Sequence, residues 1–176
     1  LLVTLSFLMT LLVPMVGPAA AKSLNSVDKV LSVADDATIS ADKAPVLTIR
    51  EDSDFVNHFK SGDTFRLVLP TDVEWNEPIV KVNGEKIAAE RRTDQVLEVT
   101  FPEGMNDDDV DYVEVALGVI LDGVSGEVAV SVEPIDSAVT GGSYAFLVAG
   151  EGKTTAIAES VETIGKSGTG GVIRIE

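Results

Sequence analysis

The chain has 176 residues, enough for one domain of ordinary size, and carries 29 acidic against 13 basic side chains for a net charge of -16. Such an acidic chain repels phosphate backbones and anionic membranes, which argues against nucleic acid and lipid surfaces as partners. It has no cysteine, which excludes disulfides and thiolate metal sites.

Residues 1–21 carry no charge and have the pattern of a secretory signal peptide. An apolar run over 1–16 is broken by Gly17 and Pro18, and the small residues at 19–21 precede Lys22. The run is short for a spanning helix, which needs about 20 residues, and a membrane anchor or a buried helix is the alternative. Because a signal peptide begins with Met and basic residues, we expect that residues are missing before Leu1. We therefore predict a secreted or cell-surface protein with no membrane contact after cleavage.

Residues 22–44 are polar and small with scattered Val and Leu. Three interpretations stay open for this segment: a linker, a first strand, or a short helix with one face made of Leu24, Val27, Val30 and Leu31.

From Pro45 onward, apolar and polar residues alternate with a period of two, which indicates strands. Leu47 and Ile49 share one face, and the same pattern follows at 65–69, 73–75 and 79–82. Asn83-Gly84 before 85–87 is the strongest short-range hairpin signal, because both turn positions need a positive φ. Further strands are expected at 95–101, 112–117, 119–121, 127–133, 144–149, 154–164 and 172–175.

Eight to ten short strands at this spacing predict an all-β fold, an antiparallel immunoglobulin-like β-sandwich preceded by the signal peptide. A barrel is the alternative. We expect the sandwich domain to cover residues 45–171.

An internal similarity links residues 45–50 (PVLTIR) to residues 171–176 (GVIRIE) at an offset of 126. The stretches before them, 37–40 (ATIS) and 162–165 (ETIG), are also alike. One domain length separates the two copies, so residues 172–176 are expected to begin a following repeat of a tandem array.

The runs IRED (49–52), FKSGDTFRL (59–67) and LPTDVEWN (69–76) resemble a repeat in large secreted or cell-surface proteins of Gram-positive anaerobes. Those proteins also carry S-layer-type or copper amine oxidase N-terminal-like domains. The resemblance covers residues 45–176 and implies an extracellular, wall-associated, non-catalytic β-sandwich. It transfers no catalytic residue, and oxidase chemistry with copper needs several His ligands where this chain has one.

Catalysis is not expected. The single histidine, His58, lies in a polar loop, and the chain has no Gly-x-Ser-x-Gly elbow for a triad. We predict no enzyme activity and no cofactor other than Ca²⁺.

Asp107, Asp109 and Asp111 form an Asp-x-Asp-x-Asp run, and alternating carboxylates suit a hard cation. Tyr112 and Gly118 stand where an EF-hand needs Gly and Glu, so that loop type is excluded. A looser calcium site remains, supported by the acidic segment 51–54, and a solvated loop is the alternative.

Trp75 and Tyr144 are candidates for stacking on a sugar, although the sequence favours a core position for Trp75. The leading interpretation is a structural or adhesive module whose partners are neighbouring domains of the same protein or a cell-wall polymer. The alternatives are a cell-wall polysaccharide-binding module, favoured if Trp75 and Tyr144 share an exposed surface, and a filament subunit that exchanges strand 172–175.

Overall fold

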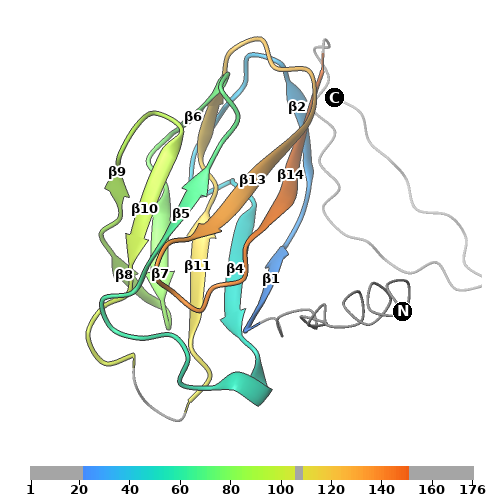
Figure 1. Ribbon diagram of the computed structural model, residues 1–176. Helices are drawn as coiled ribbons and strands as arrows, with labels where there is room; N and C mark the ends of the chain where they lie inside the picture. Colours follow the sequence, from blue (N-terminus) through green and yellow to red (C-terminus); the bar gives the residue numbers. More distant parts are fainter. Residues whose placement is uncertain (1–21, 106–108, 151–176) are drawn as a thin grey trace, which may run out of the picture.

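The computed structural model describes residues 22–105 and 109–150, and this part of the chain is all-β (Figure 1). One short 3-10 helix, η2 (Ser53–Phe55), interrupts the strands. The strands are β1 (Ser23–Val27), β2 (Leu31–Ala34), β3 (Thr38–Ile39), β4 (Val46–Glu51), β5 (Thr64–Val68), β6 (Val73–Trp75), β7 (Ile79–Val82), β8 (Glu85–Ile87), β9 (Glu90–Arg91), β10 (Val96–Thr100), β11 (Tyr112–Ala116), β12 (Val119–Leu121), β13 (Gly126–Pro134) and β14 (Gly142–Gly150).

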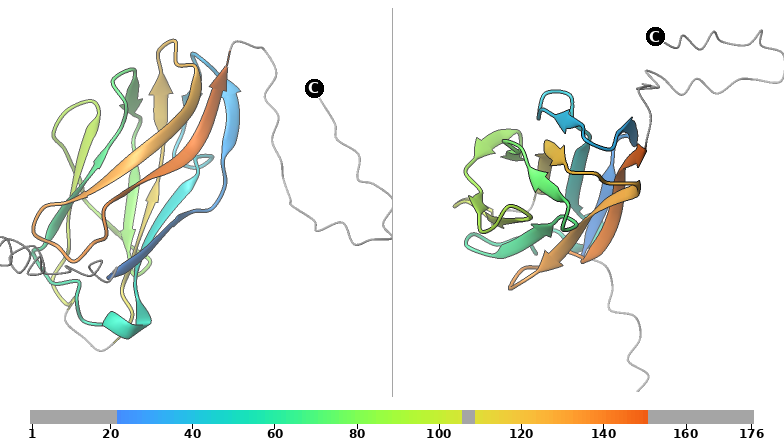
Figure 2. Two further views of the ribbon diagram at one scale, coloured as in Figure 1. Left: turned by 45° about the vertical axis from the view of Figure 1, so that its right-hand side comes forward. Right: turned by 90° about the horizontal axis from the view of Figure 1, so that it is seen from above.

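Two large sheets face each other, as the sequence predicted for a β-sandwich. Sheet A has the strand order β1-β4-β11-β7-β8, and sheet B has the order β2-β14-β13-β5-β10-β9. A third, small sheet has the order β3-β12-β6. Figure 2, seen from above, shows the sheets enclosing a common interior.

Residues 22–44 belong to the sandwich, so the described domain begins at β1 rather than at Pro45. β1 pairs antiparallel with β4, β3 pairs with β12, and β2 pairs in parallel with β14. Of the three interpretations left open for this segment, the strand applies. The β2–β14 pair is the exception to the antiparallel pairing that the sequence predicted.

Apolar side chains from both sheets fill the interior with the expected alternation. Leu47 and Ile49 of β4, and Phe65 and Leu67 of β5, are fully buried. Phe101 packs between Phe59 and Phe65, with ring centroids 4.9 and 5.6 Å away. Each such side chain contributes about 1.5–3 kcal/mol on burial, so this core holds the two sheets together.

The Asn83-Gly84 hairpin is confirmed, with φ of 50° at Asn83 and 84° at Gly84 between β7 and β8. A bulge in β14 was not expected from the sequence. Val128 pairs with Leu147 and Ala129 with Ala145, which leaves Phe146 as the extra residue. Both Phe146 and Leu147 are buried, so the bulge adds a second large side chain to the core.

No helix in the described residues is both long and apolar enough to cross a membrane. The predicted signal peptide at 1–21 and the predicted strands at 154–164 and 172–175 lie outside the described residues.

Candidate functional site

A groove on the outer face of sheet A is the candidate site, with a cavity volume of about 320 Å³. We call it the sheet A groove. Its lining residues come from three neighbouring strands and one loop: Ala41, Asp42, Val46, Ile79, Lys81, Glu114 and Ala116. The volume is at the lower end of the range of about 300–1,000 Å³ for small-molecule pockets.

The floor of the sheet A groove consists of two cross-strand rows. In the first, Ala116 of β11 pairs with Val46 of β4 and with Ile79 of β7, which makes an apolar row. In the second, Glu114 pairs with Lys81 of β7, which makes a charged row beside it. Side chains two residues apart on a strand point to the same face, so both rows face outward.

The wall of the sheet A groove is the turn that carries Ala41 and Asp42. The turn is closed by hydrogen bonds from the backbone amides of Lys43 and Ala44 to the carbonyl of Ser40, both 3.0 Å long. Gly118 allows the turn to lie against the end of β11. A Cβ added there would lie 2.4 Å from the carbonyl oxygen of Asn76 and 3.1 Å from the amide nitrogen of Ala41.

Cations gather on the outer face of sheet A although the chain as a whole is acidic. Lys81 lies directly opposite Lys86 of β8, and Arg50 of β4 is exposed on the same face. Like charges directly opposite each other on a sheet are unfavourable, and Glu114 on the other side of Lys81 offsets this repulsion in part. At the rim, the hydroxyl of Ser40 donates to Asp42 and lowers the pKa of that carboxyl, so Asp42 keeps its charge.

Sheet B differs because two exposed arginines on it, Arg66 and Arg92, form ion pairs with acids of the same sheet. Arg66 and Arg92 contact the Glu98 carboxylate at 2.9 and 2.6 Å, and Arg92 also contacts Glu90 at 2.5 Å. The hydrogen bonds from Arg92 and then Arg66 lower the pKa of Glu98. This network neutralises its own charges, so the outer face of sheet A is the better candidate for binding an anionic or mixed-charge partner.

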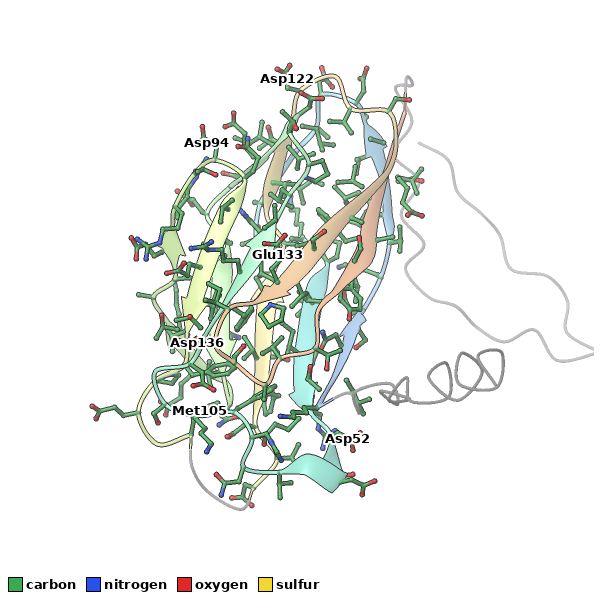
Figure 3. All side chains as sticks on the ribbon, viewed as in Figure 1. Asp52, Asp94, Met105, Asp122, Glu133 and Asp136 are labelled. Atoms are coloured by element: carbon green, nitrogen blue, oxygen red, sulfur yellow. The ribbon has the colours of Figure 1, made fainter. Side chains whose placement is uncertain are left out.

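The last residue of the acidic run, Asp111, contacts Glu51, which precedes Asp52 at the lower end of the sandwich in Figure 3. Asp111 is buried, its Oδ1 accepts from Asn83 Nδ2 at 2.6 Å, and its amide donates to Glu51 Oε2 at 3.1 Å. Asp109 is exposed, and Asp107 lies outside the described residues. Within 22–105 and 109–150, no three His, Cys, Asp or Glu side chains form a group that would hold a metal ion. Calcium at Asp107, Asp109 and Asp111 stays a prediction.

Trp75 and Tyr144 do not form a shared exposed surface. Trp75 is 1% exposed, and its Nε1 donates to the carbonyl of Gln95 at 2.9 Å. Tyr144 is half-buried on β14, pairs with Val130 and packs against the core. The core position that the sequence favoured for Trp75 is confirmed, and the indole has no free face on which to stack a sugar.

His58 lies between η2 and β5, and its backbone amide donates to Glu51 Oε1 at 2.7 Å. This bond places His58 at the lower end of the sandwich, in the loop where the sequence predicted it.

The sheet A groove was not found from the sequence. Alternation on each strand does show that Lys81 and Glu114 face away from the core. It does not show that β7 and β11, 30 residues apart, pair with Lys81 opposite Glu114. The sequence therefore shows an outward cation and an outward acid on separate strands. It does not show that the two strands are neighbours, and without the strand order the site cannot be recognised.

No protein-family model and no curated protein matches the chain. Among solved structures, the N-terminal domain of the Streptococcus gordonii adhesin Sgo0707 is similar at 13% identity and a TM-score of 0.46, over 73% of this chain and 33% of that one. The collagen-binding domain of a Staphylococcus aureus adhesin is similar at 8% identity and a TM-score of 0.42, over 72% and 99%. The collagen-binding subdomain of the Enterococcus faecalis surface protein ACE is similar at 6% identity and a TM-score of 0.39, over 75% of this chain and 99% of that one. These values assign neither a family nor a function.

Proposed function

We propose that this chain is a non-catalytic structural or adhesive module of a secreted or cell-surface protein, and one unit of a tandem array. The observation that carries the proposal is that the polypeptide enters and leaves the sandwich at opposite ends. A domain of this geometry fits head to tail into a string of similar domains without its neighbours colliding.

The two ends are identified by their contacts. Where the chain enters, the carbonyl of Lys22 accepts from the amide of Asp52 at 3.1 Å, and Asp52 lies at the lower end in Figure 3. Where it leaves, Gly150 pairs with Ala34, next to the loop after Asp122, which lies at the upper end in Figure 3. Lys22 and Gly150 therefore lie at opposite ends of the sandwich.

The internal similarity supports an array more strongly once the strands are known. Thr38-Ile39 is β3 and residues 46–51 are β4, so the segments 162–165 and 171–176 are similar in sequence to two successive strands of the described domain. The 21 residues of 151–171 follow β14, and 24 residues, 22–45, hold β1, β2 and β3 before β4. The two segments are similar in length, so each could supply the strands that precede β4 in its own unit.

A chimera tests the array. Residues 151–171 are joined directly to residues 46–150, so that the later segment replaces β1, β2 and β3. We expect the chimera and residues 22–150 to unfold cooperatively in urea. We expect residues 46–150 alone, which lack three strands, to be much less stable. A chimera no more stable than residues 46–150 alone would contradict the array.

The adhesive part of the proposal is supported by the sheet A groove. Its apolar and charged rows suit an elongated, partly anionic ligand such as a cell-wall polymer. Co-sedimentation of residues 22–176 with purified cell-wall sacculi tests this, with Lys81→Gln in the groove and Lys60→Gln as an exposed control in a loop. Saturable binding that Lys81→Gln weakens and Lys60→Gln leaves unchanged supports adhesion. Absence of binding would contradict adhesion to cell-wall polymer, and only the structural role would remain.

A further inference from the structure

We infer that the terminal strands of this domain form a connection that resists tension along the polypeptide, so that a further function of the domain is to transmit mechanical load. The inference rests on the proposed role as a module joined to neighbours at both ends. It needs only that the domain is pulled through Lys22 and Gly150, and not that the neighbours are similar domains.

The direction of pull follows from the topology. β1 begins at the lower end and runs upward, and β14 runs upward and ends at the upper end (Figure 1). Tension on the flanking segments therefore pulls β1 downward along its own axis and β14 upward along its own axis. Both strands are loaded parallel to their length.

β1 meets this load through its ladder with β4. Five residue pairs join the two strands, from Ser23 opposite Glu51 to Val27 opposite Leu47. A force along the strand stretches all of these rungs together, whereas a force across the strand breaks them one at a time. Each backbone hydrogen bond is weak alone, so sharing the load is what gives resistance.

β2 and β14 form the second barrier. They are parallel, with Leu31 opposite Leu147 and Ala34 opposite Gly150, and they belong to the first and last parts of the domain. If β1 is released, tension passes to the lower end of β2 while β14 is still pulled upward. The two neighbours then slide in opposite directions, and four residue pairs share the load. If the same two segments paired antiparallel, both points of pull would lie at the same end of the pair. The hydrogen bonds would then break one after another from that end.

A side-chain network adds to the resistance where the load enters. The amide of Ser23 donates to Thr140 Oγ1 at 3.1 Å, and the amide of Thr140 donates to Ser23 Oγ at 2.8 Å. Asn25 Nδ2 donates to the carbonyl of Thr140 at 2.7 Å. These bonds tie the start of β1 in sheet A to the turn before β14 in sheet B, so pulling β1 also strains the connection between the sheets.

Single-molecule force spectroscopy tests the inference, and the absence of cysteine from the chain makes the attachment sites selectable. In one geometry, residues 22–176 are pulled between Lys22→Cys and a cysteine added after Glu176. In the other, the first handle moves to Ser125→Cys, in the exposed turn before β13. Because Gly126 pairs with Ala149, this second geometry opens the β13–β14 ladder from its free end.

We expect the rupture force to be at least about twofold higher when the chain is pulled from Lys22 than from Ser125, because several hydrogen bonds rather than one bear the load. Equal forces in the two geometries, for variants with unchanged melting temperature, would overturn the inference.

A matched pair of Thr→Val variants tests the network. Thr140→Val removes an acceptor of Ser23, and we expect rupture at constant force from Lys22 to become about fivefold faster, the equivalent of one hydrogen bond of about 1 kcal/mol. Thr100→Val, at the exposed last residue of β10 and away from the terminal strands, is the control and should leave the rupture rate unchanged. Equal rates for both variants would show that the network does not carry load.

The outcome of the force measurements does not depend on whether the domain belongs to a tandem array. The force measurements use one domain, so they succeed or fail whether or not the chimera of 151–171 with 46–150 folds.

Discussion

Glu51 and Asp111 hold each other at the lower end of the sandwich by two reciprocal contacts. The amide of Glu51 donates to the carbonyl of Asp111 at 2.9 Å, and the amide of Asp111 donates to Glu51 Oε2 at 3.1 Å. The other carboxylate oxygen of Glu51 accepts from the amides of His58 and Phe59, both at 2.7 Å. One buried carboxylate thus fixes the loop after β4 and the start of β11.

Glu51→Gln should destabilise the domain by about 2–4 kcal/mol, because the amide group of Gln presents a donor to backbone N–H groups that need an acceptor. Urea unfolding followed by the fluorescence of Trp75 measures this. Glu127→Gln, on the exposed side of β13, is the control and should stay within about 0.5 kcal/mol of the parent. A small effect of Glu51→Gln would show that water enters and replaces the lost bonds.

Gly118→Ala should cost about 1–3 kcal/mol or more, since the new methyl group overlaps the carbonyl oxygen of Asn76, 2.4 Å from its ideal position. The same displacement moves the wall of the sheet A groove, so binding to sacculi should weaken with stability. Gly150→Ala meets no atom within 4 Å and is the matched control. Thermal unfolding of the two variants compares them, and equal melting temperatures would contradict the close approach of the Ala41 turn.

Acid should remove the stabilisation that Glu98 gives. The pKa of Glu98 is lowered in the folded domain by hydrogen bonds from Arg92 and then Arg66. A carboxyl with a lowered folded pKa stabilises above its unfolded pKa, about 4.3 for Glu, and this stabilisation is lost as the pH falls through the folded value. The free energy of unfolding of the parent should exceed that of Glu98→Gln at pH 7 and approach it in acid. Glu103→Gln, in an exposed loop, should show no such convergence.

Calcium has a direct test. If Asp107, Asp109 and Asp111 bind the ion, millimolar Ca²⁺ should raise the melting temperature relative to EDTA, because a ligand of the folded state stabilises it by mass action. Asp109→Asn should reduce the shift, and Asp122→Asn, at the other end of the sandwich, should not. Equal melting temperatures in both buffers would contradict the sequence-based prediction and leave Asp111 as an acceptor for Asn83.

The strands from β4 to β14 other than β9 were predictable because each depends on local alternation, and the Asn83-Gly84 turn because it depends on two residues with positive φ. The two residues of β9 are too few to show an alternation. β1, β2 and β3 were not, since their apolar residues, Leu24, Val27 and Leu31, fit a helical face as well as a strand. Only their pairing with β4, β14 and β12, respectively, selects the strand for them. The buried position of Trp75 followed from the apolar neighbour Val73 on the same face.

The amino-acid sequence alone specifies an acidic, cysteine-free, all-β chain, because composition, alternation and turn chemistry are properties of neighbouring residues. The sheet A groove, the parallel β2–β14 pair and the Ser23–Thr140 connection depend on which distant strands meet, and in which register. That choice is made by packing both sheets over one core, where a shift of one residue would turn each buried face outward. The groove and the resistance to load therefore appear only when the whole sandwich is assembled.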